Sequence, residues 1–530
     1  MAETICISPV DNSEYARRPV VADDRLEAVF ARARVAQRDW ARLSIAERAR
    51  CCNALTDAML AMKDDIVPEL AWQMGRPVGS GAGELRGFEE RARGMIEIAE
   101  AALAPVVPAE KSGFKRYIRR EPLGVVLTIA PWNFPYLTAV NSIVPALMAG
   151  NAVVLKHAAQ TLLVGERFQA ACDKAGLPEG LFTNLCMSHG QVSRAIAARW
   201  ADQVNFTGSV EAGRTIEQAA AGQFIGVGLE LGGKDPAYVR ADADLDFAVE
   251  NTVDGAFFNS GQSCCGIERI YVHESLYKPF VEKFVATVGN YVLGDPLDPK
   301  TTLGPMVKTA AADFVRAQIA AAVQAGATAH LNPKDFAADQ PGTPYLAPQV
   351  LTGVTHDMSV MRDESFGPVV GIMSVKHDAE AVQLMNDSPF GLTASIWTAD
   401  LKAAETHGVH EPRRLPGPHA GLDRREGHRA RRHALPGRLR DADPAEIVPP
   451  AVRNLRAGPL TLRGRRADRR AGRPGRAGSC PAGRDATADR GANRRPAEGP
   501  PAARRTTKTA AERRRQGAAK GCAVCRAAGT

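Results

Sequence analysis

Apolar residues recur with helical spacing through the first part of the chain. Between residues 24 and 105 they return at every third or fourth position, in a stretch rich in Ala, Arg, Leu and Glu. This period is typical of helices that bury one face. Ser44 and Glu47 stand three residues apart within the stretch, a pair that caps helix starts reciprocally. We therefore predict consecutive helices over residues 24–105, one of which begins just after Ser44.

A different pattern follows. Residues 124–130 form a continuous β-branched and apolar run, as expected of a strand buried on both faces. Residues 137–148 then suit a helix, and residues 151–156 suit the next strand. Strand, helix and strand within about 35 residues predict a βαβ unit and a parallel sheet. Further strands are predicted at residues 203–209, 269–273 and 369–375, and residues 114–120 alternate as an exposed strand would.

The composition changes abruptly after residue 406. Residues 407–530 contain 28 Arg, 2 Lys and 11 Asp or Glu, a net charge of +19. Subtracting them from the 67 basic and 59 acidic residues of the chain leaves 37 and 48 for residues 1–406, a net charge of −11. The later segment has no Phe, Trp or Tyr, so it lacks the apolar surface that offsets chain entropy. We predict an acidic folded body and a disordered, Arg-rich C-terminal tail.

Two explanations of the tail are open. An Arg-rich arm can bind nucleic acid through phosphates, but without aromatic residues it has nothing on which bases stack. Alternatively, the codons of residues 407–427, read one nucleotide later, permit the peptide TVFMNRADYLDP and, after three loosely constrained positions, WTGVKD. A reading frame lost near Thr406 then explains the change, and the chain is an inactive or misfolded product of its gene. We favour the shifted frame.

Other features exclude several protein classes. No apolar run reaches the roughly 18 residues of a membrane span, and the N-terminus lacks the basic start and apolar segment of a secretory signal. The 10 cysteines are scattered rather than arranged as a disulfide framework, which favours a reducing cytoplasm. One CxxC pair, Cys522 and Cys525, stands without a second ligand pair, so we predict no metal site.

Four short motifs carry the candidate chemistry. They are residues 131–135 (PWNFP), 230–234 (ELGGK), 261–265 (GQSCC) and 364–368 (ESFGP). A Cys in a Gly-flanked turn is a candidate nucleophile if a base lies near it in space. A Cys pair alone is more often apolar filler. Together, in this order and spacing, the motifs resemble the NAD(P)-dependent aldehyde dehydrogenase superfamily, from about residue 20 to residue 406.

The resemblance implies an α/β fold, with a Rossmann-type cofactor domain and an α/β catalytic domain. It assigns N-terminal helices and cofactor binding to residues 1–233, and catalysis to residues 234–406. Residues 104–122 would be an arm that pairs with another subunit in a homo-oligomer, and residues 407–530 would be the out-of-frame tail. The expected partner is a small-molecule aldehyde, with neither a membrane nor a nucleic acid.

The resemblance also implies catalytic roles. Cys264 would attack the aldehyde, and the Asn133 amide would hold the oxyanion together with the backbone N–H of Cys264. Glu230 would activate water against the thioester, which favours a free acid over acyl transfer to coenzyme A. Its apolar, tightly spaced neighbours should raise the carboxylate pKa towards the working range. We assign Cys265 to packing.

The cofactor would be NAD or NADP, although no G-x-G-x-x-G motif follows the first strand of the sheet. The resemblance points instead to the helix that opens at Gly208 and Ser209, whose amides suit a pyrophosphate. Ala159 stands where relatives carry an acidic ribose ligand, so NADP should be tolerated, and His157 should be structural. The expected cofactor-binding residues are Trp132, Lys156, Gly208, Ser209, Gly213, Glu364 and Phe366.

Overall fold

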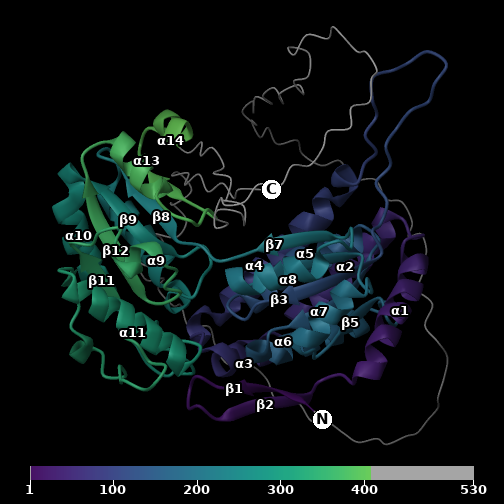
Figure 1. The fold of residues 1–530 in the computed structure, drawn as a ribbon, viewed down its shortest axis with the longest axis horizontal. Coiled ribbons are helices and arrows are strands. Elements are labelled where there is room, and N and C mark those ends of the chain that lie inside the picture. Colours follow the sequence, from purple (N-terminus) through teal and green to yellow (C-terminus); the bar gives the residue numbers. More distant parts are fainter. Residues whose placement is uncertain (1, 408–530) are drawn as a thin grey trace, which may run out of the picture. The chain divides into compact units, whose positions relative to one another are not determined.

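The computed structural model describes residues 2–407, and its first half opens with a hairpin and four helices (Figure 1). The helices predicted over residues 24–105 are confirmed, and so is the reciprocal cap at Ser44. Ser44 Oγ accepts from Glu47 N at 3.2 Å, and the Glu47 carboxylate accepts from Ser44 N at 2.8 Å. The elements are β1 (Glu3–Ile7), β2 (Glu14–Pro19), α1 (Asp23–Trp40), α2 (Ile45–Leu60), α3 (Lys63–Met74) and α4 (Val78–Ala102).

A five-stranded parallel sheet follows, in the order β5-β4-β3-β6-β7. Its central strand β3 is buried along its whole length, which confirms the prediction from the apolar run. The strands are β3 (Val125–Ala130), β4 (Ala152–His157), β5 (Phe182–Asn184), β6 (Gln203–Thr207) and β7 (Gly226–Glu230). The connecting helices are α5 (Pro135–Met148), η1 (Ala159–Thr161), α6 (Leu162–Lys174), α7 (His189–Ala197) and α8 (Val210–Ala220).

A six-stranded sheet takes up the rest, in the order β10-β11-β12-β9-β8-β13. Only the β10–β11 pairing is antiparallel. The strands are β8 (Asp235–Val239), β9 (Ile267–His273), β10 (Thr328–Ala329), β11 (Gln349–Thr352), β12 (Val369–Val375) and β13 (Ser395–Trp397). The helices are α9 (Leu245–Phe257), η2 (Phe258–Gly261), α10 (Glu274–Val288), α11 (Thr309–Gln324), η3 (Pro333–Asp335), α12 (Ser359–Arg362), α13 (Asp378–Asn386) and α14 (Leu401–His407). The sheets change between β7 and β8, beside the predicted boundary at residue 233; the division into two domains stays a prediction.

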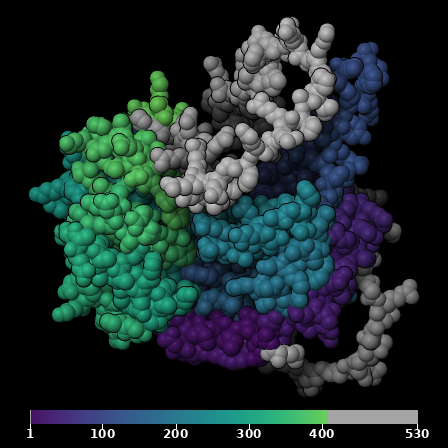
Figure 2. Space-filling model, in the orientation of Figure 1, coloured from purple at the N-terminus to yellow at the C-terminus, as the bar shows by residue number. Residues whose placement is uncertain are grey.

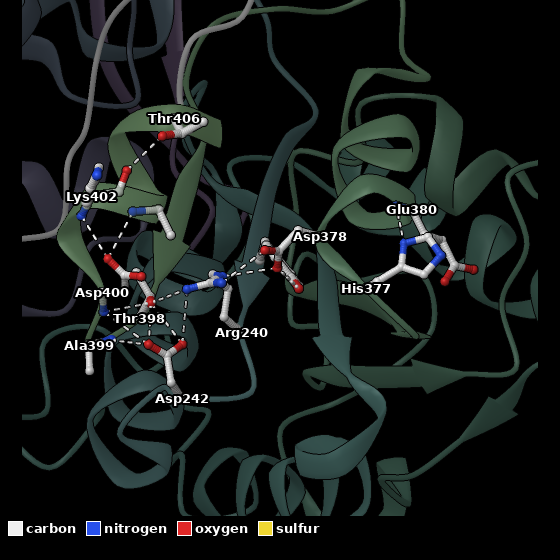
Figure 3. A network of polar contacts seen from close by, with 12 residues as sticks. Arg240, Asp242, His377, Asp378, Glu380, Thr398, Ala399, Asp400, Lys402 and Thr406 are labelled. Atoms are coloured by element: carbon white, nitrogen blue, oxygen red, sulfur yellow. Dashed lines mark hydrogen bonds and ion pairs between the residues drawn. The ribbon is translucent and has the colours of Figure 1, made fainter.

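A polar network fastens the last described strand to the sheet (Figure 3). Asp242 follows β8, and its carboxylate accepts from Thr398 Oγ1 and from the backbone N–H groups of Ala399 and Asp400. Arg240 donates to Thr398 Oγ1 at 2.9 Å and to the carboxylate of Asp378, the first residue of α13. The chain after β13 is therefore held by side chains that directly follow β8, the strand with which β13 pairs.

The predicted arm is exposed but is not a regular strand. Residues 104–122 carry two isolated bridges, Val106 to Ile118 and Lys111 to Phe114, in place of a continuous ladder. Several of their apolar side chains are exposed, Phe114 at 62% and Ile118 at 63% among them. The blue atoms of this segment stand out at the upper right of Figure 2.

Two further predictions concern a membrane span and the C-terminal tail. Over residues 2–407 no helix is long and apolar enough to cross a bilayer. Apart from His407, the predicted tail, with its Cys522–Cys525 pair, lies outside the described residues.

Candidate active site

Asn133, the candidate oxyanion donor, lies in the turn between the end of β3 and the start of α5. Pro135 opens α5, and the Glu84 carboxylate accepts from the N–H groups of Tyr136 and Leu137 at 3.0 and 2.9 Å. This satisfies two backbone donors that have no partner within the helix. Asn133 therefore sits at the carboxyl end of a parallel strand, the edge at which α/β proteins bind ligands.

The Asn133 amide touches the loop of the candidate nucleophile. Asn133 is 4% exposed, and its Nδ2 donates to the backbone carbonyl of Gln262 at 3.2 Å. Gln262 lies two residues before Cys264. The structure thus brings together two predicted catalytic residues that are 131 positions apart in the chain.

The cysteine loop has an unusual backbone. Asn259 and Ser260 have φ values of 55° and 57°, a left-handed conformation rare in residues with side chains. Gly261 follows with φ 70°, and a Cβ there would lie 2.2 Å from the carbonyl oxygen of Gly367. Glycine is required at this position, and the loop packs directly on the motif at residues 364–368.

The two thiols of this loop are coupled. Cys264 is half-buried and Cys265 is exposed, so the assignment of Cys265 to packing is wrong. The Cys264 thiol donates to Cys265, which lowers the pKa of Cys265 to about 6, while the neighbouring sulfur and burial raise the pKa of Cys264. Together the pair loses its first proton below the usual range of a thiol, because the remaining hydrogen stabilises the thiolate.

The motif at residues 230–234 lies against the same loop at Gly233. A Cβ on Gly233 would lie 2.3 Å from the Cys264 carbonyl oxygen, so only glycine allows this approach. Glu230 ends β7 and is exposed, which corrects the prediction of tight, apolar surroundings. The reason is topological: β7 is an edge strand that pairs only with β6.

A cavity of about 270 Å³ opens beside these loops. It is lined by Trp132, Gln262, Glu364 and Phe366, and by residues of α11 with the segment before it. The rings of Trp132 and Phe366 meet edge to face, with centroids 5.6 Å apart. Glu364 Oε1 accepts from Gly233 N at 3.1 Å, and burial raises the pKa of Glu364 to about 7. The expected nicotinamide-side residues thus line one cavity.

A buried ion pair that the sequence did not predict supports the loop that carries Glu364 and Phe366. Lys234 Nζ pairs with Glu268, and Glu268 accepts from the N–H groups of Ser365 and Phe366 at 2.8 and 2.9 Å. The Lys234 ammonium also donates to Ser365 Oγ at 3.0 Å. The sequence signal was a lysine ending the motif at residues 230–234, but nothing in the sequence indicates its partner.

The expected adenosine side has its own cavity, of about 360 Å³. Lys156 lines it from β4, half-buried, and within residues 2–407 its ammonium has no hydrogen-bond partner. Burial lowers the pKa of Lys156. An unsatisfied, partly buried ammonium fits a ligand rich in hydroxyl or phosphate oxygens. Ala159, Ser188 and His189 share the cavity, and the last two were not predicted.

The other residues singled out in the sequence lie in the neighbouring elements. His157 is buried; its ring nitrogens contact Pro135 O at 3.3 Å and Thr161 Oγ1 at 3.1 Å, and burial lowers its pKa to about 4, as suits a structural residue. Ser209 caps α8 by accepting from Ala212 N at 3.3 Å. Gly208 precedes this cap, and Gly213 is buried on the side of α8 nearest Leu231. Among the described residues no group of His, Cys, Asp and Glu forms a metal site.

Comparisons with known proteins agree with this geometry. The profile of the "Aldehyde dehydrogenase family" matches residues 2–409, which extends the predicted range of 20–406 at both ends. The chain is 35% identical over 396 residues to succinate-semialdehyde dehydrogenase (NADP(+)) 1 of Mycobacterium tuberculosis, covering 74% of this chain and 86% of that protein. It is 36% identical over 404 residues to 3,6-anhydro-alpha-L-galactose dehydrogenase of Streptomyces coelicolor, covering 75% and 81%.

A solved structure gives the same result. The NAD-dependent aldehyde dehydrogenase from Sinorhizobium meliloti superposes with a TM-score of 0.72 at 33% identity, covering 77% of this chain and 81% of that one. Both the family profile and these relatives span most of the described residues. The chain belongs to the aldehyde dehydrogenase family.

Proposed function

We propose that this chain oxidises an aldehyde to a free carboxylic acid through a covalent intermediate on Cys264. The observation that carries the proposal is the hydrogen bond from Asn133 Nδ2 to Gln262 O, which sets an amide donor two residues from a thiol. Family membership gives the reaction class, aldehyde oxidation with NAD+ or NADP+. The roles of individual residues are our proposal.

Cys264 and Asn133 carry the first step. The Cys264 thiol, which is partly exposed, first loses its proton to solvent. Its sulfur then attacks the aldehyde carbon, and the carbonyl oxygen becomes an alkoxide. One hydrogen of Asn133 Nδ2 is used by Gln262; the second, with the N–H of Cys264, is available to the alkoxide. A donor placed where charge develops typically lowers the barrier by about 3 kcal/mol.

The cofactor sites are proposed from the two cavities. Lys156 would bind the adenosine ribose, the start of α8 at Gly208 and Ser209 would bind the pyrophosphate, and Glu364 with Phe366 would hold the nicotinamide ribose. When bound there, the cofactor would accept the hydride that leaves the substrate carbon as the alkoxide becomes a thioester. With Ala159 in place of an acidic residue, the adenosine cavity has no charge there to repel a 2′-phosphate.

Glu230 would complete the turnover. Its carboxylate takes a proton from water, the oxygen attacks the thioester carbonyl, and the thiolate of Cys264 leaves as the acid forms. The exposed position of Glu230 at the end of β7 supports this role, because the side chain reaches solvent water.

The test is turnover by the full chain, with Asn133→Ala as the diagnostic variant. We expect aldehyde-dependent formation of reduced nicotinamide and an equal amount of acid, and a loss of about 10²- to 10³-fold in kcat for Asn133→Ala. Succinic semialdehyde and 3,6-anhydrogalactose are the first aldehydes to try, given the names of the relatives. Asn141→Ala, on α5, the helix that follows Asn133, is the matched control.

Two outcomes bear directly on the proposal. Equal activity in Asn133→Ala and Asn141→Ala would remove the oxyanion role. Activity found only after the codons from residue 407 onward are restored to the shifted frame would keep the assigned residues and show that this chain is the inactive product.

Location and assembly are proposed on narrower grounds. The buried thiols of Cys6, Cys52 and Cys172 are free, which supports a reducing, cytoplasmic location. The exposed apolar residues of the arm at 104–122 support pairing with a second copy of this chain.

A further inference from the structure

Arg76 is a buried arginine whose three donors reach three separate segments. Its side chain is 1% exposed. Nε donates to Asn259 Oδ1 at 3.2 Å, Nη1 pairs with Glu84, and Nη2 donates to the backbone carbonyl of Asn133. A planar guanidinium has donors in fixed directions, so binding all three acceptors fixes their relative positions.

Each acceptor has a second bond that leads to the candidate site. Glu84 also holds the start of α5, through Tyr136 N and Leu137 N. Asn259 Nδ2 donates both to Asn133 O at 3.2 Å and to Gln262 O at 3.1 Å. The Asn133 amide and Asn259 therefore converge on one carbonyl, that of Gln262.

Aromatic rings close this network from the side. The Arg76 guanidinium lies 4.7 Å from the centre of the Phe134 ring and 5.9 Å from that of Phe258. The two rings stack on each other, with centroids 6.1 Å apart. The same buried cation thus contacts the residue after Asn133 and the residue before Asn259.

The loop needs such support. Two consecutive residues with side chains in the left-handed region are strained, because Cβ lies close to the following carbonyl oxygen there. At Asn259 and Ser260 this conformation persists because their side chains are bonded, Asn259 as above and Ser260 Oγ to Gly304 O at 2.8 Å.

We propose that Arg76 is a positioning residue, which sets the Asn133 amide against the loop of Cys264 and so determines the geometry of oxyanion binding. This inference rests on the proposed function, because it takes Asn133 as the oxyanion donor and Cys264 as the nucleophile. Arg76 itself touches neither substrate nor cofactor in this role.

Arg76→Lys is the central variant. Lysine keeps a positive charge beside Glu84, but one ammonium on a flexible stem cannot hold three acceptors in fixed directions. We expect kcat to fall about 100-fold, the effect of an error of about 1 Å in a reacting group, with the KM values for aldehyde and cofactor nearly unchanged. Arg48→Lys is the matched control, since Arg48 is also buried and donates to the carbonyls of Leu43 and Met148.

A double-mutant cycle separates positioning from general support. In the Asn133→Ala background, Arg76→Lys should cost little further activity, because the group it positions is already gone. Additive losses, or a fall in melting temperature and a rise in KM that Arg48→Lys reproduces, would overturn the proposal.

Hydrogen exchange gives a readout that does not depend on activity. Arg76→Lys should speed amide exchange in residues 130–137 and 259–266 and leave β12 unchanged, whereas Arg48→Lys should spare both segments. Unchanged protection of both segments in Arg76→Lys overturns the inference even if the enzyme is inactive. If protection is lost while Asn133→Ala keeps full activity, the proposed function fails instead.

Discussion

Two buried ion pairs support the two walls of the candidate site, and they differ in what they hold. In each, a glutamate accepts from two consecutive backbone N–H groups: Glu84 at the start of α5, and Glu268 in the loop after α12. Arg76, the partner of Glu84, also reaches Asn133 and Asn259. Lys234, the partner of Glu268, also donates to Ser365, which lies within the loop that Glu268 already holds.

The difference follows from the two cations. A guanidinium presents several directed donors, so the arginine pair relates two distant segments to each other; an ammonium acts as a point charge, so the lysine pair stabilises one loop. We therefore expect the arginine pair to govern the chemical step and the lysine pair to govern stability and cofactor binding.

The largest effect should fall on the arginine side, at the cysteine loop. We expect Cys264→Ser to lower kcat by on the order of 10³-fold or more, because a hydroxyl is a far poorer nucleophile than a thiol. Cys265→Ser should keep most of the activity. Steady-state rates decide this, and the reverse result would identify the exposed Cys265 as the nucleophile and separate Asn133 from the reacting sulfur.

Lys234→Met tests the lysine side. It should lower the free energy of unfolding by about 3–5 kcal/mol, because it leaves the Glu268 carboxylate buried without a counter-charge. The double variant Lys234→Met/Glu268→Gln should recover most of that loss, as measured by urea unfolding. If the double variant lowers kcat and leaves the cofactor KM unchanged, the lysine pair affects the chemical step and not cofactor binding, contrary to this expectation.

Glu230→Gln examines a residue that neither pair holds. Hydrolysis of the thioester should slow about 100-fold while hydride transfer persists, so a burst of reduced nicotinamide should precede a slow steady state. Glu217→Gln, an exposed glutamate on α8, is the control. Equal losses in burst and steady state would count against Glu230 as the base.

Glu364 links the lysine side to pH. Because burial raises its pKa to about 7, the carboxylate forms mainly above neutrality. Its hydrogen bonds to the ribose should then strengthen, so the cofactor Kd should fall up to about tenfold between about pH 6 and pH 8. In Glu364→Gln the cofactor Kd should stay nearly constant over this pH range. Fluorescence titration with the cofactor measures it. A variant with the wild-type pH profile would assign the titration to another group.

The smallest effect is expected at the adenosine cavity, whose lining includes no member of either pair. Ala159→Glu should disfavour NADP relative to NAD by about 1 kcal/mol, since the site is exposed and solvent screens the repulsion of the 2′-phosphate. The ratio of the kcat/KM values for the two cofactors measures it. A ratio that barely moves would show that Ala159 does not face the ribose.

Local patterns predicted five of the strands (β3, β4, β6, β9 and β12), the N-terminal helices and the motifs of the site. The run at residues 369–375 matches β12 in full, and Asn133, Glu364 and Phe366 meet the cysteine loop or the cavity beside it. The predicted burial of two residues was wrong. Glu230 is exposed because β7 is an edge strand, and Cys265 is exposed in its turn. Both errors concern burial, which depends on neighbours distant in the chain.

The sequence by itself determined the family and the elements with a clear hydrophobic period, and it indicated the candidate reacting groups, because hydrophobic period and short motifs are local properties. Only the tertiary structure decided which buried side chains hold the loops of the candidate site in place. Arg76 lies 57 residues from Asn133 and 183 from Asn259, and Lys234 lies 34 from Glu268. A hydrogen bond depends on position and direction in space, so these partners became visible only once both sheets had brought their loops together.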